Sequence, residues 1–551
     1  MFSVIILLSG CVKQYTNEPL PNKSPQTFFW IYSDTAVATG ISKQELRWWG
    51  EDPDGYVVGY LLAVTPDLVV IPNPDTLTYS YVTTTDSVIR FPLRTAQQTF
   101  LVAVHAIDNT MKYPLSVGAK IKLSPFPYWD VNGDGIFDSP DIRLDNLLNS
   151  MDANGAKQRF PTKNTPPTIN YVPDDADNTV YAQPPPVTFT VASFSWEGHD
   201  FDGDETITGY RISLNDSTFA HPLVVSSKVT TVTLSVPRAR SDSASTSSVA
   251  ADVLFGTSPN LKKLGTLSGM QMDANNILYI QSVDIAGDMS TFLRFPSSGR
   301  TWMVKKPRGK FLIVADYGFG PGDSSLVRTF YTDSVFSKLG VPYDFLDIQV
   351  GSTSTRTYGI YAPARQHLNP CLIETYKLYS CVFWYSSGTP NLEIARKTLY
   401  NYWSLEGGHL IVSSYFVNPG VIPDAGHAYR DIAPLDSLGS SSIGTRFSGV
   451  LNPDSSLSSD LYPVMGFKAR LATGLCVFPM YNNAAARNIY YLPTSTSYPR
   501  TSAGVLDGSG HMIFFNIPLH YLSSVYPKDT NDNDQGVVAF FKKAFVLFGI
   551  Q

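Results

Sequence analysis

48-WWGEDPDGYVVGY-60 returns later in the chain, in altered form, as 196-WEGHDFDGDETITGY-210. Both stretches follow the pattern Trp-x-Gly-x-Asp-x-Asp-Gly and then reach a Gly-Tyr pair, which comes two residues later in the second copy. Each copy is followed by an alternating apolar segment that ends in an aspartate, Asp108 in the first and Asp284 in the second. Matched features in the same order predict a duplicated domain.

The duplicated domain is expected to be a β-sandwich. A Trp on one strand, a tight Asp-Gly turn and a Tyr on the next strand resemble fibronectin type III and related immunoglobulin-like domains. The proline-containing segments 21-PNKSP-25 and 164-NTPP-167 place the first copy at residues 25–125 and the second at 165–305. A Ser/Ala/Gly-rich insertion near 238–270 enlarges the second copy, and we expect it to be an exposed loop.

The Asp-x-Asp-Gly turns allow two interpretations. In the first, the aspartates hydrogen-bond to their own turn and the glycine takes a positive φ. In the second, three carboxylates gather around a cation at one end of each sandwich, similar to the arrangement in cadherin-like domains. The two sets are Asp52, Asp54 and Asp108, and Asp200, Asp202 and Asp284. We favour the first interpretation.

Length and composition narrow the classes of function. A chain of 551 residues is too long for one hydrophobic core, so three or four domains are expected. Its 39 glycines and 39 prolines suit a turn-rich β protein. Charged residues make up 16% of the chain and the net charge is −6, without a basic stripe, which argues against a nucleic-acid partner.

The N-terminus, 1-MFSVIILLSGC-11, has an apolar run that is too short to cross a bilayer as a helix and suits a signal peptide. Its Leu-Ser-Gly-Cys end resembles the lipobox of bacterial lipoproteins. The resemblance implies that Cys11 is lipidated, that residues 1–11 form a signal peptide with its lipobox, and that acyl chains hold the protein on a membrane. Residues 12–24 are expected to be a tether. The expected location is the bacterial cell envelope, at the outer membrane, facing the periplasm or the surface.

Between the two copies lies 129-WDVNGDGIFDSPDIRLDNLLNSMD-152, which has the spacing of an EF-hand calcium loop. Oxygen ligands at alternate positions suit Ca²⁺, and the glycine at the sixth position permits a sharp turn. The predicted ligands are Asp130, Asn132, Asp134, the carbonyl of Ile136, Asp138 and Asp141.

Pro140 is predicted to open a helix after this loop, because four apolar residues follow at helical spacing. They are Leu144, Leu147, Leu148 and Met151. Asp141 at the twelfth position resembles the dockerin variant of the loop, but the next candidate, 152-DANGAK-157, lacks the required carboxylate and glycine. We therefore expect the loop and helix, residues 128–152, to hold the angle between the two sandwiches rather than to dock a cohesin.

Residues 308–551 change to an α/β pattern. Buried strands are predicted at 309–318, 342–348, 379–387, 409–416 and 510–522, with helices at 326–340, 391–408 and 534–549. Nearly continuous apolar strands that alternate with helices predict a parallel sheet covered on both faces.

One motif in this region resembles the class I glutamine amidotransferase-like superfamily, which has a flavodoxin-like fold. Its residues are Leu399, Tyr402, Trp403, Gly407, Gly408, Leu410, Ile411 and Val412. The resemblance implies a nucleophilic cysteine on a sharp turn directly after this strand. Here that position reads 413-SSYF-416, so the nucleophile is missing and no catalytic residue is expected.

We therefore expect a non-catalytic lipoprotein that binds or assembles with a protein or glycan partner, with Ca²⁺ as a structural ion. The alternative is an envelope hydrolase, acting on carbohydrate, that uses the carboxyl ends of the parallel strands. Its candidate residues are Asp316, Tyr317, Ser386, Ser387, Ser413, Ser414 and His520.

The cysteines beyond Cys11 match no metal-binding spacing. They are Cys371, Cys381 and Cys476. A disulfide between the first two and a set of buried free thiols both remain open.

Overall fold

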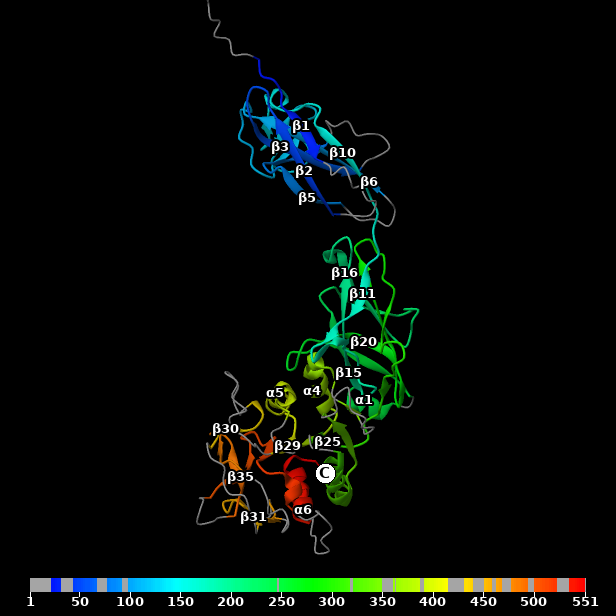
Figure 1. Ribbon diagram of the computed structural model, residues 1–551, viewed down its shortest axis with the longest axis vertical. Coiled ribbons are helices and arrows are strands. Elements are labelled where there is room, and N and C mark those ends of the chain that lie inside the picture. Colours follow the sequence, from blue (N-terminus) through cyan, green and yellow to red (C-terminus); the bar gives the residue numbers. More distant parts are fainter. Residues whose placement is uncertain are drawn as a thin grey trace, which may run out of the picture. The chain divides into compact units, whose positions relative to one another are not determined.

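The computed structural model forms two compact units, Met1–Pro167 with His199–Ile207 and Asp284–Asp288, and the remainder of the chain (Figure 1). The residues that it describes are 21–30, 43–66, 77–91, 98–244, 247–317, 321–348, 360–361, 363–386, 391–414, 431–439, 450–457, 462–467, 477–493, 500–522 and 535–550. Cys11, Ser387 and Cys476 lie outside this part of the chain.

The first sandwich has a sheet of three strands and a sheet of seven. The smaller contains β1 (Gln26–Trp30), β2 (Lys43–Glu51) and β5 (Asp86–Arg90). The larger runs in the order β10 (Ala156–Thr162), β6 (Gln98–Asp108), β3 (Val57–Pro66), β4 (Thr78–Val82), β7 (Lys120–Lys122), β8 (Tyr128–Asp130) and β9 (Ile142–Arg143). Because β8, β9 and β10 pair within this sheet, the domain extends to Thr162 instead of ending near residue 125.

The second sandwich packs a five-stranded sheet with a four-stranded one. The first contains β11 (Thr168–Tyr171), β15 (Val191–His199), β18 (Thr231–Ser235), β19 (Ser248–Phe255) and β20 (Lys262–Gln271). The second contains β17 (Leu223–Ser226), β16 (Ile207–Leu214), β22 (Leu278–Asp284) and β23 (Leu293–Phe295). The prediction of two β-sandwiches is confirmed.

The repeated Trp and Tyr join the two sheets of each sandwich. Trp48 on β2 meets Tyr60 on β3 edge-on at 6.3 Å between ring centroids, and Trp196 on β15 meets Tyr210 on β16 in the same way at 5.5 Å. All four rings are at most 5% exposed. The Asp-x-Asp-Gly turn is therefore the crossing from one sheet to the other.

The described residues of the insertion form regular secondary structure, contrary to the prediction of an exposed loop. It forms α1 (Arg238–Ser243) and the antiparallel strands β19 and β20. Val249, Ala251 and Val253 alternate inward on β19 and are at most 8% exposed. This period-two pattern of small apolar residues was hidden by the Ser- and Gly-rich composition.

The C-terminal domain contains a ten-stranded sheet in which six strands are parallel. In spatial order these are β27 (Ile360–Tyr361), β26 (Tyr343–Asp347), β25 (Phe311–Asp316), β28 (Cys381–Ser386), β29 (Leu410–Ser413) and β36 (Met512–Phe515). Antiparallel strands continue the sheet through β35 (Ser502–Leu506), β34 (Arg487–Tyr491), β31 (Val450–Pro453) and β32 (Met465–Gly466). The antiparallel part was not predicted, since its strands are short.

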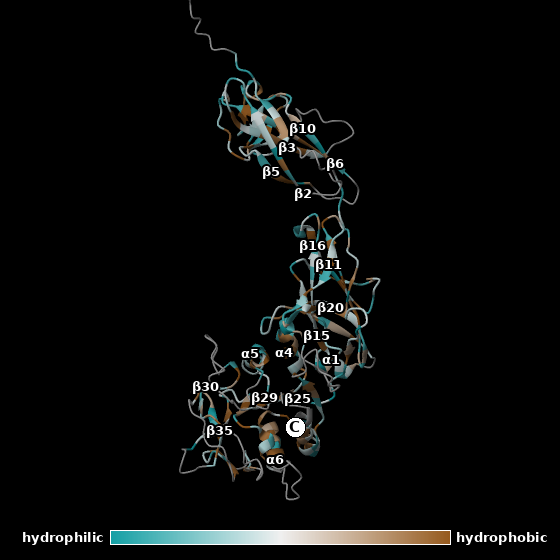
Figure 2. Cartoon of the chain, viewed as in Figure 1, coloured by the Kyte–Doolittle hydropathy of each residue, from teal (hydrophilic) through white to brown (hydrophobic). Residues whose placement is uncertain are grey.

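Helices cover both faces of the parallel strands. They are α2 (Pro321–Thr329), α3 (Ser337–Leu339), α4 (Leu368–Tyr376), α5 (Leu392–Tyr400) and α6 (Gln535–Leu547), with π-helical turns at Phe330–Phe336 and Asn401–Leu405. Alternate residues of β25 enter two separate cores, Phe311 and Ile313 with α6, Leu312 and Val314 with α4 and α5. Hydrophobic residues accordingly concentrate in these central elements (Figure 2).

The second sandwich and the C-terminal domain share a core. Phe189 and Val191 belong to the same buried cluster as Leu312 and Trp384, and Phe189 meets Tyr379 edge-on at 5.5 Å. Two domains that bury apolar side chains against one another are expected to act as one rigid body. Among the described residues, no helix combines the length and the hydropathy needed to span a membrane.

Candidate functional site

The predicted calcium loop closes the hairpin between β8 and β9. Asp130 ends β8, is 4% exposed, and accepts hydrogen bonds from the amides of Gly133 at 2.7 Å and Gly135 at 2.9 Å. Both glycines have φ near +80°, a conformation that other residues rarely adopt. The loop is therefore wound around the Asp130 carboxylate by its own backbone.

Three predicted ligands converge. Carboxylate oxygens of Asp130, Asp134 and Asp141 all lie within 4.8 Å of one another. The side-chain amide of Asn132 donates to Asp138 at 3.0 Å and to Asp134 at 3.2 Å. Asn132 and Asp138, the other two predicted side-chain ligands, are therefore linked to the carboxylate cluster through Asp134. None of the four carboxylates forms an ion pair with a described residue.

The Ile136 carbonyl stays a predicted ligand. The Ile136 side chain is 67% exposed, and its amide donates to Asp134 Oδ1 at 2.8 Å. Beneath the loop, Tyr128 donates its hydroxyl to the Gly135 carbonyl at 2.8 Å. Burial raises the pKa of Tyr128, and the charges of Asp130, Asp141 and Asp134 raise it further. A cluster of hard oxygens with excess negative charge fits Ca²⁺.

The helix predicted after the loop is wrong. The chain returns as β9 and then makes a single 3-10 turn at Leu147–Asn149. Leu144, Leu147 and Met151 are at most 1% exposed in the core of the first sandwich, whereas Leu148 is 53% exposed. Leu144, Leu147 and Met151 are buried in the core of the sandwich without forming a helix. Their spacing therefore reflects packing against the sheet and not the apolar face of a helix.

The carboxyl ends of the parallel strands hold the residues of the hydrolase alternative. At the end of β25, Asp316 is 2% exposed and accepts from the Trp384 indole at 3.1 Å and from the Asn391 amide at 2.6 Å. Asn391 in turn caps α5, since its side chain accepts from Ile394 at 3.3 Å. Asp316 thus anchors the start of α5.

Ser386, Ser413 and Ser414, the serines of this edge that the structure describes, are fully buried. Ser386 donates to Ser414 at 2.6 Å across neighbouring strands. Ser413 accepts from the Leu519 amide at 2.7 Å and donates to the Ile517 carbonyl at 3.4 Å. The Ser413 hydroxyl therefore fastens β29 to the segment that follows β36.

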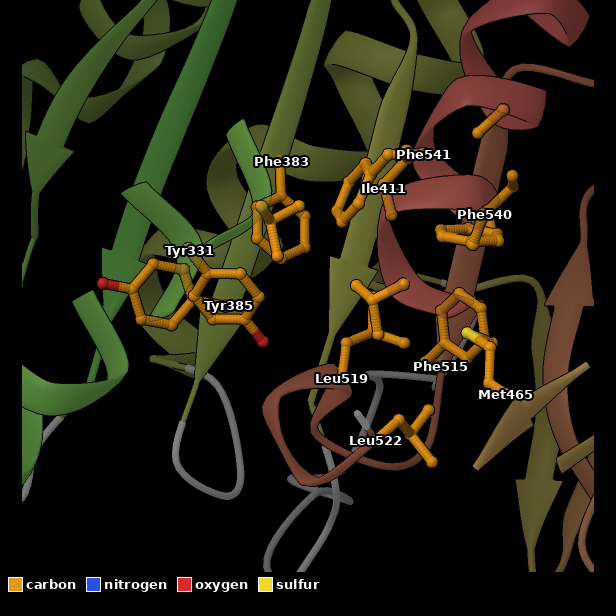
Figure 3. Close-up of a cluster of buried hydrophobic side chains, with 14 of the residues drawn as sticks. Tyr331, Phe383, Tyr385, Ile411, Met465, Phe515, Leu519, Leu522, Phe540 and Phe541 are labelled. Atoms are coloured by element: carbon orange, nitrogen blue, oxygen red, sulfur yellow. The ribbon is translucent and has the colours of Figure 1, made fainter. Parts of the chain in front are cut away.

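His520 lies against aromatic rings at the same edge. Its Nδ1 lies 3.2 Å from the Tyr331 hydroxyl, which also accepts from the His520 amide at 3.1 Å, and its ring meets Tyr317 edge-on at 5.8 Å. His520 is 5% exposed. The neighbouring core contains Tyr331, Tyr385 and Leu519 (Figure 3), and the rings of Tyr331 and Tyr385 lie 4.5 Å apart between centroids.

The described cysteines are buried free thiols rather than a disulfide. Cys371 is 4% exposed and Cys381 is 0% exposed. Burial raises the pKa of Cys371 to about 12 and raises that of Cys381 as well. Burial therefore favours the neutral thiol over the thiolate at both positions.

The Asp-x-Asp-Gly turns show the favoured hydrogen bonds, but the expected positive φ is found only at Gly203, at +120°, and not at Gly55. Asp52 accepts from the Asp54 amide at 3.3 Å, and Asp200 accepts from the Asp202 amide at 2.8 Å. Sequence reasoning missed the partners of the turns, Asn22 and Asn164, which donate to Asp108 at 2.8 Å and to Asp284 at 2.6 Å. The signal was present, because an asparagine stands three residues before a proline where each sandwich begins.

No family model matches this chain, and no curated protein matches it. Similar solved structures include fibronectin(III)-like modules of CbhA from Clostridium thermocellum (11% identity, TM-score 0.15, covering 51% of this chain and 95% of that one). The FN1-FN3 domains of chicken CNTN1 are 13% identical with a TM-score of 0.15, and the match covers 50% of this chain and 67% of that one. A chimeric titin Z1Z2-Z1Z2 tandem is 9% identical with a TM-score of 0.14, and the match covers 49% of this chain and 93% of that one. The β-sandwich assignment rests on the strand pairing of this chain, and these neighbours have no bearing on function.

Proposed function

We propose that this protein is a non-catalytic lipoprotein of the bacterial cell envelope that binds or assembles with a protein or glycan partner. The observation that carries the proposal is the state of the carboxyl edge, where Ser413, Ser414 and His520 are at most 5% exposed and hydrogen-bonded to the protein itself. A nucleophile must be accessible to its substrate. The buried hydroxyl groups of Ser413 and Ser414 instead form hydrogen bonds that hold the strands together.

In this proposal the C-terminal domain is a flavodoxin-like, amidotransferase-like domain without its nucleophile. The five longer parallel strands β26, β25, β28, β29 and β36 support the proposal, because they follow the order 2-1-3-4-5 along the chain. When the two-residue edge strand β27 is counted, the six parallel strands read 3-2-1-4-5-6, the other order of doubly wound α/β folds. Cys381 supports the loss of activity, since it opens β28 as a buried thiol instead of following β29. Cys11 would attach the protein to the outer membrane.

Calcium is proposed as a structural ion of the hairpin loop. The convergence of Asp130, Asp134 and Asp141 supports this assignment. Because β8 and β9 belong to the sheet of the first sandwich, the ion would brace that sandwich rather than an interdomain joint.

The test of the absent activity uses the full chain and three variants, Ser413→Ala, Ser414→Ala and His520→Ala. We expect no turnover of glutamine, ester or glycan substrates by the parent protein. Turnover that disappears in one of these variants, with an unchanged melting curve, would replace the proposal with the envelope hydrolase. Metabolic labelling with a fatty acid tests the anchor, and Cys11→Ala should abolish incorporation.

A further inference from the structure

The three-stranded sheet of the first sandwich carries aromatic and apolar side chains on its outer face. Trp48 of β2 and Ile89 of β5 belong to the core of the sandwich. Their neighbours Trp49 and Val88 therefore point the other way, because side chains alternate along a strand. Trp49 is 41% exposed, Val88 is 49% exposed, and Trp30 at the end of β1 is 51% exposed. A group of large exposed apolar side chains on one face indicates a binding surface.

The register of β1 and β2 brings the aromatic residues of this face together. Phe28 lies directly opposite Trp49, and the two rings are stacked with 5.1 Å between centroids and 20° between planes. Trp30 follows two residues after Phe28 and lies opposite Arg47, so it occupies the same face. Trp30 and Trp49 are thus diagonal neighbours, which on antiparallel strands lie about 7–8 Å apart. The sheet holds both indole rings at fixed positions.

The charges of these three strands are balanced. Arg47 pairs with Glu45 at 3.0 Å and stands opposite Asp86 on β5. A surface without net charge gives no long-range attraction to an ionic partner. Its polar side chains still donate and accept hydrogen bonds beside the rings. The strands contain three basic and three acidic residues, namely Lys43, Arg47, Arg90, Glu45, Glu51 and Asp86.

In the second sandwich, the equivalent face contacts the C-terminal domain. The match of Trp48 with Trp196 places Ser195 at the position of Arg47. Ser195 Oγ lies 2.7 Å from His367 Nε2, so the side chain points into the contact between the two domains. A small side chain at this position lets the neighbouring domain approach the sheet closely.

The first sandwich is not built for a contact of the same kind. Arg47 replaces the small Ser195, and Trp49 stands where the second copy has Glu197. Long ion-paired side chains and an exposed indole would keep a packed protein domain away from the sheet. A ligand that lies flat on the rings meets no such obstacle.

A neutral sugar chain matches these properties. The C–H groups on the face of a pyranose ring carry a partial positive charge, so they pack favourably on the electron-rich face of an indole. The hydroxyl groups at the rim of the sugar can exchange hydrogen bonds with Arg47 and Glu45. Two indoles at diagonal positions offer stacking surfaces to successive sugar units of one chain.

We infer that the outer face of β1, β2 and β5 binds a neutral glycan chain by stacking on Trp30 and Trp49. The inference rests on the proposed function, for which it names the class of partner and the place of binding. Figure 1 shows these three strands together in the first sandwich.

Native electrophoresis of the full chain through gels that contain a soluble polysaccharide tests the inference. The neutral probes are a β-glucan, a galactomannan and an α-glucan. We expect at least one of them to retard the parent protein, and Trp49→Ala and Trp30→Ala to weaken this binding roughly tenfold or more. Trp49→Phe keeps an aromatic ring and should retain most of the affinity.

Tyr181→Ala is the matched control, because it removes an aromatic side chain of the second sandwich that is 58% exposed. It should leave the retardation unchanged. All variants should melt like the parent protein, since the substituted side chains are exposed. Equal retardation of the parent protein and both tryptophan variants, or no retardation by any neutral probe, would overturn the inference.

Two other occupants of the face give different results. Retardation by dextran sulfate alone would indicate a charge-driven interaction and overturn the inference. Sedimentation velocity would do the same if the parent protein were a dimer that Trp49→Ala converts to a monomer, because a second copy would then cover the face.

The chain length of each polysaccharide after incubation separates this inference from the proposed function. A shortened polysaccharide would contradict the non-catalytic proposal, whether or not the face binds it. An intact polysaccharide that does not retard the protein would remove only the glycan and leave a protein partner in the proposed function.

Discussion

Asp130 and Asp134 contribute differently to the hairpin loop. Asp130 is buried and binds two backbone amides, so its removal would disturb the loop even without an ion. Asp134 is exposed, and its carboxylate accepts from Ile136 and Asn132 within the loop. Asp134 is therefore the better position at which to remove a ligand without unfolding the turn.

Asp134→Ala should lower the melting temperature of the first sandwich in calcium and leave it nearly unchanged in chelator. An ion at about 100 times its Kd contributes about 2.7 kcal/mol to stability. For a domain of this size, that corresponds to a shift of roughly 5–10 °C. Differential scanning calorimetry with and without chelator measures it, and equal melting of the parent protein in both conditions would exclude the ion.

His367 is a buried histidine between the second sandwich and the C-terminal domain. Its Nε2 lies 2.7 Å from Ser195 Oγ, and its Nδ1 has no partner among the described residues. Burial lowers the pKa of His367 from 6.5 to about 4. The neutral ring is thus the form that fits the interface.

The pH dependence follows from this depressed pKa. Below pH 6.5 the imidazole of His367 is protonated in the unfolded chain but stays neutral in the folded protein. The free energy of unfolding is therefore highest above pH 6.5 and decreases as the pH falls towards 4. The largest loss is roughly 3 kcal/mol. Denaturant unfolding between pH 7 and pH 4 should show this loss, and His367→Gln should remove much of the slope. A parent protein as stable at pH 4.5 as at pH 7 would contradict the assignment.

At the scale of the elements, the Gly-Tyr pair that follows each turn is explained by close packing. A Cβ on Gly209 of β16 would collide with the Val225 carbonyl of the neighbouring strand β17. A Cβ on Gly59 of β3 would instead meet the buried ring of Tyr81, whose hydroxyl donates to the Val58 carbonyl at 3.0 Å. The same sequence position therefore meets the backbone of a paired strand in one copy and a hydrogen-bonded side chain in the other.

Gly209→Ala should destabilise the protein by about 2 kcal/mol, and Gly59→Ala by less, since overpacking costs about 1–3 kcal/mol when the surroundings cannot move. Urea unfolding of the two variants gives the comparison. Gly118→Ala cannot serve as a control for steric crowding. Gly118 has φ +87° and no neighbour within 4 Å of an added Cβ, so any loss of stability would come from backbone strain alone. A larger loss for Gly59→Ala than for Gly209→Ala would contradict this account.

For the whole molecule, the shared core predicts cooperative unfolding of the second sandwich with the C-terminal domain. Phe189 and Val191 are at most 3% exposed within the cluster that also holds Trp384. We expect two calorimetric transitions for three domains, with the first sandwich melting by itself. Phe189→Ala should lower only the larger transition, at a cost of about 3–5 kcal/mol. Three separate transitions would refute the coupling.

Much of the architecture followed from local patterns. The Trp and Tyr repeat predicted both sandwiches, and the end of α3 was predicted at Gly340, which has φ +66°. These features depend on neighbours in sequence, on strand alternation and on a glycine that accepts a left-handed conformation. The alternation of oxygen ligands from Asp130 to Asp141 is likewise local, and the structure brings Asp130, Asp134 and Asp141 together.

What the amino-acid sequence determined by itself was the repeat, the kinds of layer and the residues able to hold an ion. Only the tertiary structure decided that residues 142–151 complete the first sandwich, that the insertion forms β19 and β20, and that Asn164 meets Asp284. The reason is physical. A strand without its partner leaves backbone groups unpaired, and an apolar residue without a facing surface gains nothing from burial. Such segments acquire their structure from contacts with residues that lie far away along the chain.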